Sequence, residues 1–220
     1  SMQNRNDALS IDGLTVEYRT YDGVVHALNN LDLRIEHGKA HGLVGETGAG
    51  KTTTGLAIMG LIPTPPGAIC GGKIEFDGID LLNYNEKEMA RIRGKQISMI
   101  FQDPMTSLNP VLDVQTQIAE VIELHEHVSR DTAYTKAAGM LETVGIPASR
   151  GKEYPHQFSG GMKQRVVIAI ALSCNPKLLI ADEPTTALDV TIQAQVLDKI
   201  REIRRTYGTS MLMITHDLGV

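Results

Sequence analysis

The sequence predicts an α/β protein in which a mostly parallel β-sheet carries helices on both faces. Short apolar runs of strand length alternate along the chain with helical patterns, and this order is typical of parallel sheets that are covered on both sides. One run, Ala40 to Val44, leads into a glycine-rich loop that is followed by a helical pattern. This unit of strand, loop and helix is therefore the centre of the expected fold.

The expected elements follow from the spacing of apolar residues, which has a period of two in half-buried strands and of about 3.6 in amphipathic helices. The expected strands are Leu9 to Tyr18, Ala27 to Glu36, Ala40 to Val44, Lys73 to Asp77, Gln96 to Phe101, Leu178 to Ala181 and Ser210 to Thr215. The expected helices are Thr52 to Gly60, Glu86 to Arg93, two within residues 113–145, Gly160 to Ser173 and Thr191 to Arg204. Asp22-Gly23 favours a turn between the first two strands, which predicts an antiparallel unit at the start of the chain.

Length and composition favour one globular domain. A chain of 220 residues with 42% hydrophobic and 21% charged residues has enough apolar surface for one large core. We expect this domain to cover residues 3–220 and to include a helical insertion at about residues 104–165. We interpret Ser1 and Met2 as residues that were left behind when a tag was removed.

Charge and cysteine content argue against several classes of function. The net charge of −5 argues against a nucleic-acid partner, because binding to the phosphate backbone needs a basic surface. Cys70 and Cys174 lack the paired spacing of a metal site or a redox couple, so both are expected to be ordinary reduced thiols. No apolar run approaches the roughly 18 residues that cross a bilayer, so we expect a cytosolic chain that does not insert by itself.

The glycine-rich loop carries the strongest motif in the chain. Its residues are Gly45, Glu46, Thr47, Gly48, Ala49, Gly50, Lys51 and Thr52, and they fit the pattern G-x-x-x-x-G-K-[ST]. Backbone N–H groups of such a loop form an anion site at the start of a helix, where the helix dipole favours negative charge. Lys51 is expected at the β- and γ-phosphates of a nucleotide, Thr52 at Mg²⁺ and Thr53 near the α-phosphate. A glycine-rich turn that only caps a helix needs neither the lysine nor the hydroxyl.

Two adjacent carboxylates follow the apolar run Leu178 to Ala181 at the edge of the sheet where ligands bind in open α/β folds. Asp182 is expected to hold Mg²⁺ directly or through water, and Glu183 to act as the general base on the attacking water. Alone, two acids after a strand are more often a solvated loop or a helix cap. Because the phosphate loop occurs earlier in the chain, the catalytic interpretation of the two acids is favoured over the structural one.

A second anion site is predicted where Ser159, Gly160 and Gly161 open a helix. Because the phosphate loop already holds one ATP, this helix start is interpreted as serving the γ-phosphate of an ATP held by another chain. The alternative is a plain helix cap formed by Ser159.

The run Phe158 to Arg165 resembles the signature of the ABC family, usually written LSGGQ. Phosphate loop, signature and paired acids occur in that family's order and cover nearly the whole chain. The strings Phe101 to Pro110 and Tyr154 to Ser159 resemble the peptide and nickel uptake branch. The resemblance implies a P-loop NTPase fold with a RecA-like parallel core, an amino-terminal antiparallel β-subdomain and an inserted helical subdomain. It also implies an ATPase that uses ATP and Mg²⁺ to drive solute uptake through a permease.

Further roles come from the resemblance alone. It implies that Gln102 reaches Mg²⁺ and the attacking water, that Asp189 crosses a dimer interface, and that His216 contacts the γ-phosphate. Asp189 as a helix cap and His216 as a structural histidine are the alternatives. Tyr18 is expected to stack on adenine; Tyr21 is its rival, and packing of either tyrosine in the core is the alternative.

Partners are also implied by the resemblance. Met162 stands where the family prefers glutamine, which favours a heterodimer with a second, glutamine-bearing ABC ATPase subunit over a homodimer. Transmembrane permease subunits, an indirect extracytoplasmic solute-binding protein and a place on the cytoplasmic face of the membrane are expected, with di- or oligopeptides as the favoured solute. A soluble ABC ATPase outside transport is the alternative. His41 is interpreted as structural on a buried strand, and the end of the chain four residues after His216 predicts a truncated form of a longer protein.

Overall fold

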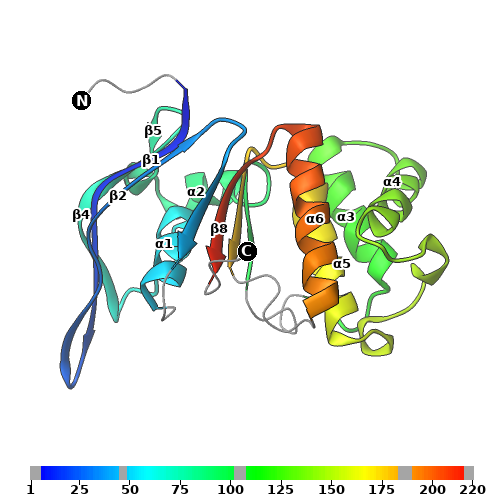
Figure 1. Ribbon diagram of the computed structural model, residues 1–220, viewed down its shortest axis with the longest axis horizontal. Helices are drawn as coiled ribbons and strands as arrows, with labels where there is room; N and C mark the ends of the chain where they lie inside the picture. The colour runs from blue at the N-terminus through cyan, green and yellow to red at the C-terminus, as the bar shows by residue number, and fades with distance from the viewer. Residues whose placement is uncertain (1–5, 45–48, 102–107, 183–189, 216–220) are drawn as a thin grey trace.

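The computed structural model describes residues 6–44, 49–101, 108–182 and 190–215. Its strands form two four-stranded sheets, one antiparallel and one parallel. In Figure 1 the antiparallel sheet lies on the left, the parallel sheet in the middle and most helices on the right. The predicted α/β class, with an antiparallel unit at the start of the chain and a parallel core, is confirmed.

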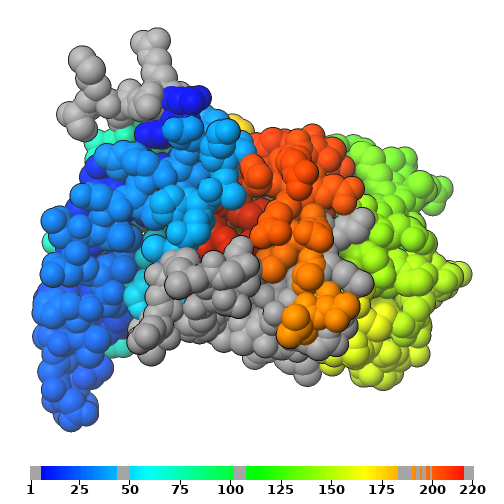
Figure 2. Space-filling view, in the orientation of Figure 1, coloured from blue at the N-terminus to red at the C-terminus, as the bar shows by residue number. Residues whose placement is uncertain are grey.

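The antiparallel sheet has the strand order β2-β1-β4-β5. Its strands are β1 (Asp7–Thr20), β2 (Gly23–Glu36), β4 (Gly67–Phe76) and β5 (Ile79–Asp80). The expected turn at Asp22-Gly23 is confirmed, because Gly23 pairs with Thr20 and has a φ of 124°. The long hairpin of β1 and β2 extends beyond the body of the molecule at the lower left of Figure 2.

Strand β4 begins six residues before the expected start at Lys73. Glycines hide this part of the strand in the sequence, because Gly67, Gly71 and Gly72 interrupt the apolar alternation. Gly72 has a φ of 104°, and a Cβ atom there would lie 2.5 Å from the Cα atom of Leu14. Only glycine allows β4 to approach β1 at the irregularity in their pairing.

The parallel sheet has the strand order β3-β8-β7-β6. Its strands are β3 (Ala40–Val44), β8 (Ser210–Thr215), β7 (Leu178–Asp182) and β6 (Ile97–Ile100). Every residue of β7 and β6 is buried, as expected for parallel strands covered on both faces. Strand β3 lies at the edge of the described sheet and His41 is half-buried, so the expectation of a buried strand at His41 is wrong.

The helices lie on both faces of the parallel sheet. They are α1 (Ala49–Met59), α2 (Glu86–Ile92), α3 (Val114–Glu126), α4 (Arg130–Thr143), α5 (Gly160–Ser173) and α6 (Val190–Tyr207). Short 3-10 turns cover Leu81–Asn83, Ala148–Arg150 and Pro155–Gln157. Side-chain caps from Asn85, Asp113 and Ser129 start α2, α3 and α4.

Alternate residues of the central strands pack into two hydrophobic clusters. Leu178 and Ile180 of β7 join a cluster between the two sheets that also contains Ile58 of α1. Leu179 and Ala181 point to the other face and join the cluster of α3, α4, α5 and α6. The period of two along β7 thus divides the core into two layers, one on each face of the sheet.

Helices α3 and α4 form the described part of the predicted insertion at about residues 104–165. They pack on each other and on α5, and their buried side chains share one cluster with the parallel sheet. Ile118 of α3 and Leu141 of α4 are fully buried in that cluster. These two helices therefore share a core with the parallel sheet, and the inserted helical subdomain and its bounds stay a prediction.

Both cysteines are free thiols, Cys70 in β4 and Cys174 at the end of α5. Burial raises the pKa of the Cys174 thiol to about 11, so this thiol stays protonated at neutral pH. The pKa of the exposed Cys70 thiol is also raised, mainly by local loss of solvation. No helix in the described ranges is both long enough and apolar enough to cross a membrane.

The two-layer core predicts a large cost for shortening a side chain of β7. Ile180→Ala removes a fully buried side chain and should lower the free energy of unfolding by about 2–4 kcal/mol. The matched control Ile79→Ala changes a residue that is 41% exposed and should cost less than about 1 kcal/mol. Urea unfolding followed by circular dichroism measures both, and similar losses in the two variants would contradict the assignment of β7 to the core.

Candidate functional site

Helix α1 begins inside the glycine-rich motif. Its first residue is Ala49, three positions before the expected start at Thr52. Lys51 and Thr52 therefore lie in the first turn, where backbone N–H groups have no partner within the helix. An anion at this end is favoured by those N–H groups and by the helix dipole.

Two glycines allow α1 to lie close to both sheets. A Cβ atom on Gly50 would lie 2.7 Å from the carbonyl oxygen of Ala27 in β2. A Cβ atom on Gly55 would lie 2.9 Å from Met99 and 3.3 Å from Ile180, on the facing surface of the parallel sheet. The start of α1 therefore lies between the two sheets. Residues larger than glycine at positions 50 and 55 would clash with the neighbouring strands at this distance.

Lys51 is buried next to the end of strand β8. Its side chain is 7% exposed, and its Nζ atom donates to the carbonyl oxygen of Thr215 at 3.5 Å. The contact follows from topology, because β3 pairs in parallel with β8 and both strands end at the same edge of the sheet. The phosphates of a nucleotide would place negative charge next to this buried ammonium group.

Thr52 is bound to the first of the two paired acids. Its Oγ1 atom donates to Oδ2 of Asp182 at 3.0 Å, and Asp182 is 2% exposed at the end of β7. The bond joins residues that are 130 positions apart in the sequence. It brings together the hydroxyl and the carboxylate that the sequence predicts as ligands of one ion.

These two oxygen atoms have the chemistry and spacing that Mg²⁺ requires. Magnesium prefers octahedral oxygen ligands at about 2.0–2.1 Å, which places neighbouring ligands roughly 2.9 Å apart. The 3.0 Å between Thr52 and Asp182 fits that arrangement. Within the described ranges no group of three or more His, Cys, Asp and Glu residues forms a metal cage. A site with few protein ligands is what Mg²⁺ uses when phosphates supply the rest.

Tyr18 lies beside α1, whereas Tyr21 does not. The hydroxyl of Tyr18 lies 3.5 Å from Oγ1 of the buried Thr53, and the Tyr18 ring packs over Gly67. Tyr21 is fully exposed at the tip of the β1–β2 hairpin, so packing of Tyr21 in the core is wrong. Tyr18 is thus the tyrosine next to the phosphate motif, and its stacking on adenine stays a prediction.

The start of α5 has the geometry of an exposed helix cap. Ser159 accepts a hydrogen bond from the backbone N–H of Met162 at 3.3 Å. Ser159 and Gly160 are exposed, Gly161 is half-buried, and a Cβ atom on Gly160 would meet nothing within 4 Å. A plain helix cap formed by Ser159 is the alternative interpretation given in the sequence analysis. The exposed start of α5 also leaves room for an anion that another chain holds.

The starts of α1 and α5 lie in different parts of the molecule. Figure 1 shows the start of α1 next to the antiparallel sheet and the start of α5 on the side of α3 and α4. Their neighbours agree, because α1 contacts β2, β6 and β7, whereas α5 contacts α3, α4 and β6. The two predicted anion sites are therefore separate within one chain.

Met162 is held by its own chain. Nη1 of Arg150 lies 3.4 Å from the sulfur of Met162, and the same guanidinium lies 4.8 Å from the centre of the Phe158 ring. Arg150 also forms an ion pair with Glu153. Sequence reasoning missed Arg150, because its contacts depend on the fold of the loop before α5 and no local pattern marks them.

Several predicted residues have positions that the structure does not describe. Gly45, Glu46, Thr47, Gly48, Gln102, Glu183, Asp189 and His216 lie outside the described residues. Ala49 is described only as the first residue of α1. The described residues bring together Tyr18, Thr53, Lys51, Thr52 and Asp182 around the start of α1.

Comparison with curated proteins gives close matches over almost the whole chain. The chain is 53% identical over 214 residues to the oligopeptide transport ATP-binding protein OppD of Bacillus subtilis, covering 96% of this chain and 60% of that protein. It is 51% identical over 220 residues to OppD of Salmonella typhimurium, covering 99% of this chain and 65% of that protein. The chain thus spans less than two thirds of the length of these relatives.

Solved structures share the fold. A dimeric post-hydrolysis state of the ATP-binding cassette MJ0796, bound to ADP and Pi, matches with a TM-score of 0.85 and 26% identity over 96% of this chain and 89% of that chain. The structure of cbiO1 from Clostridium perfringens matches with a TM-score of 0.80 and 27% identity, over 96% and 79% of the two chains. The predicted P-loop NTPase fold is confirmed by these neighbours. The family model described as ABC transporter matches residues 28–186, which is most of the sequence, and the chain belongs to the ABC transporter family.

Proposed function

We propose that the chain is the ATP-binding and ATP-hydrolysing part of an ABC importer subunit that drives peptide uptake. The hydrogen bond of Thr52 to Asp182, next to the buried Lys51, is the observation that carries the proposal. The family match and relatives named for oligopeptide and dipeptide transport support it. Both relatives are described as ATP-binding proteins, and neither name points to an ATPase outside transport.

ATP binds with its phosphates at the start of α1. Backbone N–H groups of residues 45–50 surround the phosphates, and the Lys51 ammonium meets the β- and γ-phosphates. The hydroxyl of Thr53 serves the α-phosphate. Tyr18 stacks on adenine, since it lies against Thr53 on the same side of α1.

Thr52, Asp182 and Gln102 hold Mg²⁺ in this proposal. The ion supplies neutralisation of the charge that develops on the phosphate oxygens. The hydrogen bond of Thr52 to Asp182 keeps both oxygens in place before the ion arrives, so less ordering is needed on binding.

Hydrolysis transfers the γ-phosphoryl group to water. Glu183 accepts a proton from the attacking water as the bond to the γ-phosphorus forms, and the bond to the β-phosphate oxygen breaks to release ADP. Gln102 orients the water and His216 contacts the γ-phosphate. Lys51 stabilises the charge on the transferring group by its fixed position next to β8.

A second ABC ATPase subunit completes the site. Ser159, Gly160 and Gly161 at the start of α5 contact the γ-phosphate of the ATP held by that subunit, and Asp189 crosses the interface. The exposure of Ser159 and Gly160 supports this role. We infer a heterodimer, because Met162 turns its sulfur to Arg150 and offers no hydrogen-bond donor to a partner's nucleotide.

The dimer drives transmembrane permease subunits from the cytoplasmic face of the membrane. ATP binding closes the two subunits, and hydrolysis with release of phosphate opens them again. An extracytoplasmic solute-binding protein supplies di- or oligopeptides to the permease and acts on this chain only indirectly. The names of the relatives at about 50% identity support peptides as the solute.

Two variants separate nucleotide binding from turnover. Lys51→Ala should weaken ATP binding by about ten- to a hundredfold, because it removes a charge-assisted contact to phosphate. Glu183→Gln should leave ATP affinity unchanged and lower turnover at least about a hundredfold, because it removes the base. Isothermal titration calorimetry measures affinity, and phosphate release by the full-length protein with its partners measures turnover.

The matched control is Lys87→Ala, which removes an exposed lysine of α2 and should change neither quantity. If Lys51→Ala bound ATP as tightly as the native chain, the proposed phosphate contact would be wrong. If Glu183→Gln kept its turnover, another group would have to serve as base.

Purification of the full-length protein from its own membranes tests the partners. We expect it to come with permease subunits and one non-identical ABC ATPase subunit, because Met162 favours an asymmetric dimer. Quantitative mass spectrometry gives the ratio of the chains. Two copies of this chain without a second ATPase would contradict the heterodimer, and recovery without any permease would contradict the role in transport.

A further inference from the structure

Gln164 is a buried glutamine whose side-chain amide has no hydrogen-bond partner among the described residues. It lies in the second turn of α5 and is 1% exposed. Neither its Oε1 atom nor its Nε2 atom makes a hydrogen bond within the part of the chain that the structure describes. A buried amide in this position has lost its bonds to water without a replacement, so it lowers the stability of the folded chain.

A second buried glutamine, Gln117 of α3, shows how the same side chain is satisfied elsewhere in the protein. Gln117 is 8% exposed, and its Oε1 accepts a hydrogen bond from the N–H of Asn109 at 2.9 Å. Its Nε2 donates to the carbonyl oxygens of Asn109 at 2.8 Å and of Leu112 at 2.9 Å. Gln117 thus uses both ends of its amide to hold the loop before α3. Gln164 has the same groups and holds nothing in the single chain.

The next residue of α5 carries a similar group. The Nε atom of Arg165 is buried and makes no hydrogen bond in the described ranges, and its Nη1 donates to the carbonyl oxygen of Gly145 at 3.4 Å. Buried polar groups without partners are uncommon in native proteins, and each needs a specific explanation. Two successive residues of this kind indicate that the second turn of α5 has a role beyond folding.

Gln164 lies where the start of α5 meets the carboxyl ends of the parallel strands. It stands one helical turn after Gly160 and one turn before Ile168, which shares a hydrophobic cluster with Ile100 of β6. Helix α5 contacts β6 and leads through a short turn into β7, which is parallel to β6. The start of α5 is therefore directed to the strand end that carries Asp182. Helical side chains lean toward the start of their helix, so the amide of Gln164 lies between the two predicted phosphate sites.

We propose that Gln164 is a positioning residue that couples the two nucleotide sites of the dimer. When the start of α5 receives the ATP of the second subunit, the amide of Gln164 gains hydrogen bonds to peptide groups at the end of β6. A peptide group offers the donor and the acceptor that the two ends of the amide require. This role rests on the proposed function, because it needs an ATP that a second subunit holds.

The unpaired amide makes this coupling favourable. A group that is unsatisfied in one state and bonded in another shifts the equilibrium toward the second state by the difference between the two. Gln164 therefore disfavours the single chain and favours the ATP-bound dimer. One or two hydrogen bonds correspond to a shift of about tenfold in that equilibrium.

Urea unfolding of two matched variants tests whether the amide is unpaired in the single chain. Methionine has nearly the length and the helix propensity of glutamine but lacks the amide. Gln164→Met should leave the urea midpoint unchanged or raise it, because no group loses a hydrogen bond. Gln117→Met should lower the midpoint by about 0.5 M or more, because it leaves groups of Asn109 and Leu112 without their partner.

ATP turnover by the full-length protein with its permease and second ATPase subunit tests the coupling. Gln164→Met and Gln164→Leu should each lower kcat at least about tenfold, because both remove the amide. The ATP affinity of the chain's own site, measured by calorimetry, should stay unchanged, since Lys51 and Thr52 are untouched. Gln117→Met should keep the native kcat. A merely structural role of Gln164 would instead lower stability and turnover together.

The proposal is overturned if Gln164→Met lowers the urea midpoint as much as Gln117→Met does, because the amide would then be bonded in the single chain. It is also overturned if both variants of Gln164 turn over ATP at the native rate, and the proposed function would stand in that case. A native complex that hydrolyses no ATP would contradict the proposed function, and the coupling role with it.

Discussion

The hydrogen bond between Thr52 of α1 and Asp182 of β7 is the constraint on which the rest of the structure depends. It forms only if the first turn of α1 reaches the end of a buried strand, and the close approach at Gly50 and Gly55 makes this possible. Asp182 is 2% exposed, and the half-buried Thr52 donates a hydrogen bond to its carboxylate. The hydrophobic layers around β7 therefore serve to hold one polar pair in place at the sheet edge.

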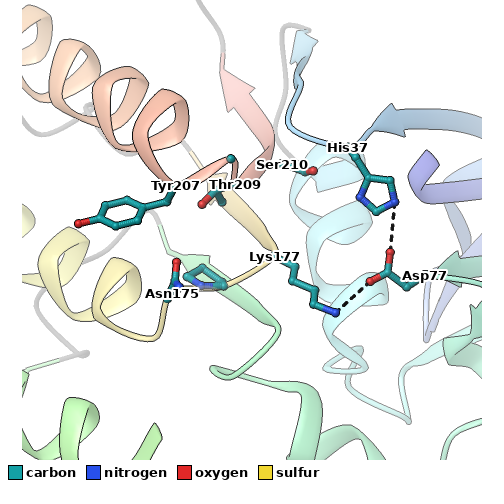
Figure 3. Close-up of a pocket in the computed structure, with 9 residues that line it drawn as sticks. His37, Asp77, Asn175, Lys177, Tyr207, Thr209 and Ser210 are labelled. Atoms are coloured by element: carbon teal, nitrogen blue, oxygen red, sulfur yellow. Dashed lines mark hydrogen bonds and ion pairs between the residues drawn. The ribbon is translucent and has the colours of Figure 1, made fainter. Parts of the chain in front are cut away.

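The two sheets contribute different parts of the site. The parallel core supplies Lys51, Thr52 and Asp182, whereas the antiparallel sheet brings Tyr18 to the side of Thr53. At the opposite edge of the core, the ion pair of Asp77 with Lys177 joins the same two sheets again (Figure 3). The position of Tyr18 relative to the phosphate motif thus depends on contacts at both edges of the parallel sheet.

Sequence reasoning succeeded where burial imposes a simple pattern. The bounds of β3, β8 and α5 agree with the expected ranges, because each is an apolar run or helix between clear turn residues. It failed in the first half of β4, where glycines remove the alternation. For the site, the glycine-rich motif predicted Lys51 and Thr52, and the two adjacent carboxylates predicted Asp182. No local pattern predicts that Lys51 reaches Thr215, that Arg150 holds Met162, or that Asp77 pairs with Lys177, because these contacts join distant parts of the chain.

The central claim is that Thr52 and Asp182 together form a magnesium and nucleotide site. The most direct measurement compares ATP binding by calorimetry with Mg²⁺ and with EDTA, in the native chain and in Thr52→Val. The quantity compared is the ratio of the ATP affinity with Mg²⁺ to the ATP affinity with EDTA in the same protein. Small losses of stability in the variant affect both affinities and therefore cancel in this ratio. The account predicts that Mg²⁺ strengthens ATP binding in the native chain and that Thr52→Val loses this gain by at least about tenfold, since a metal ligand is removed. An equal gain from Mg²⁺ in both proteins would contradict it.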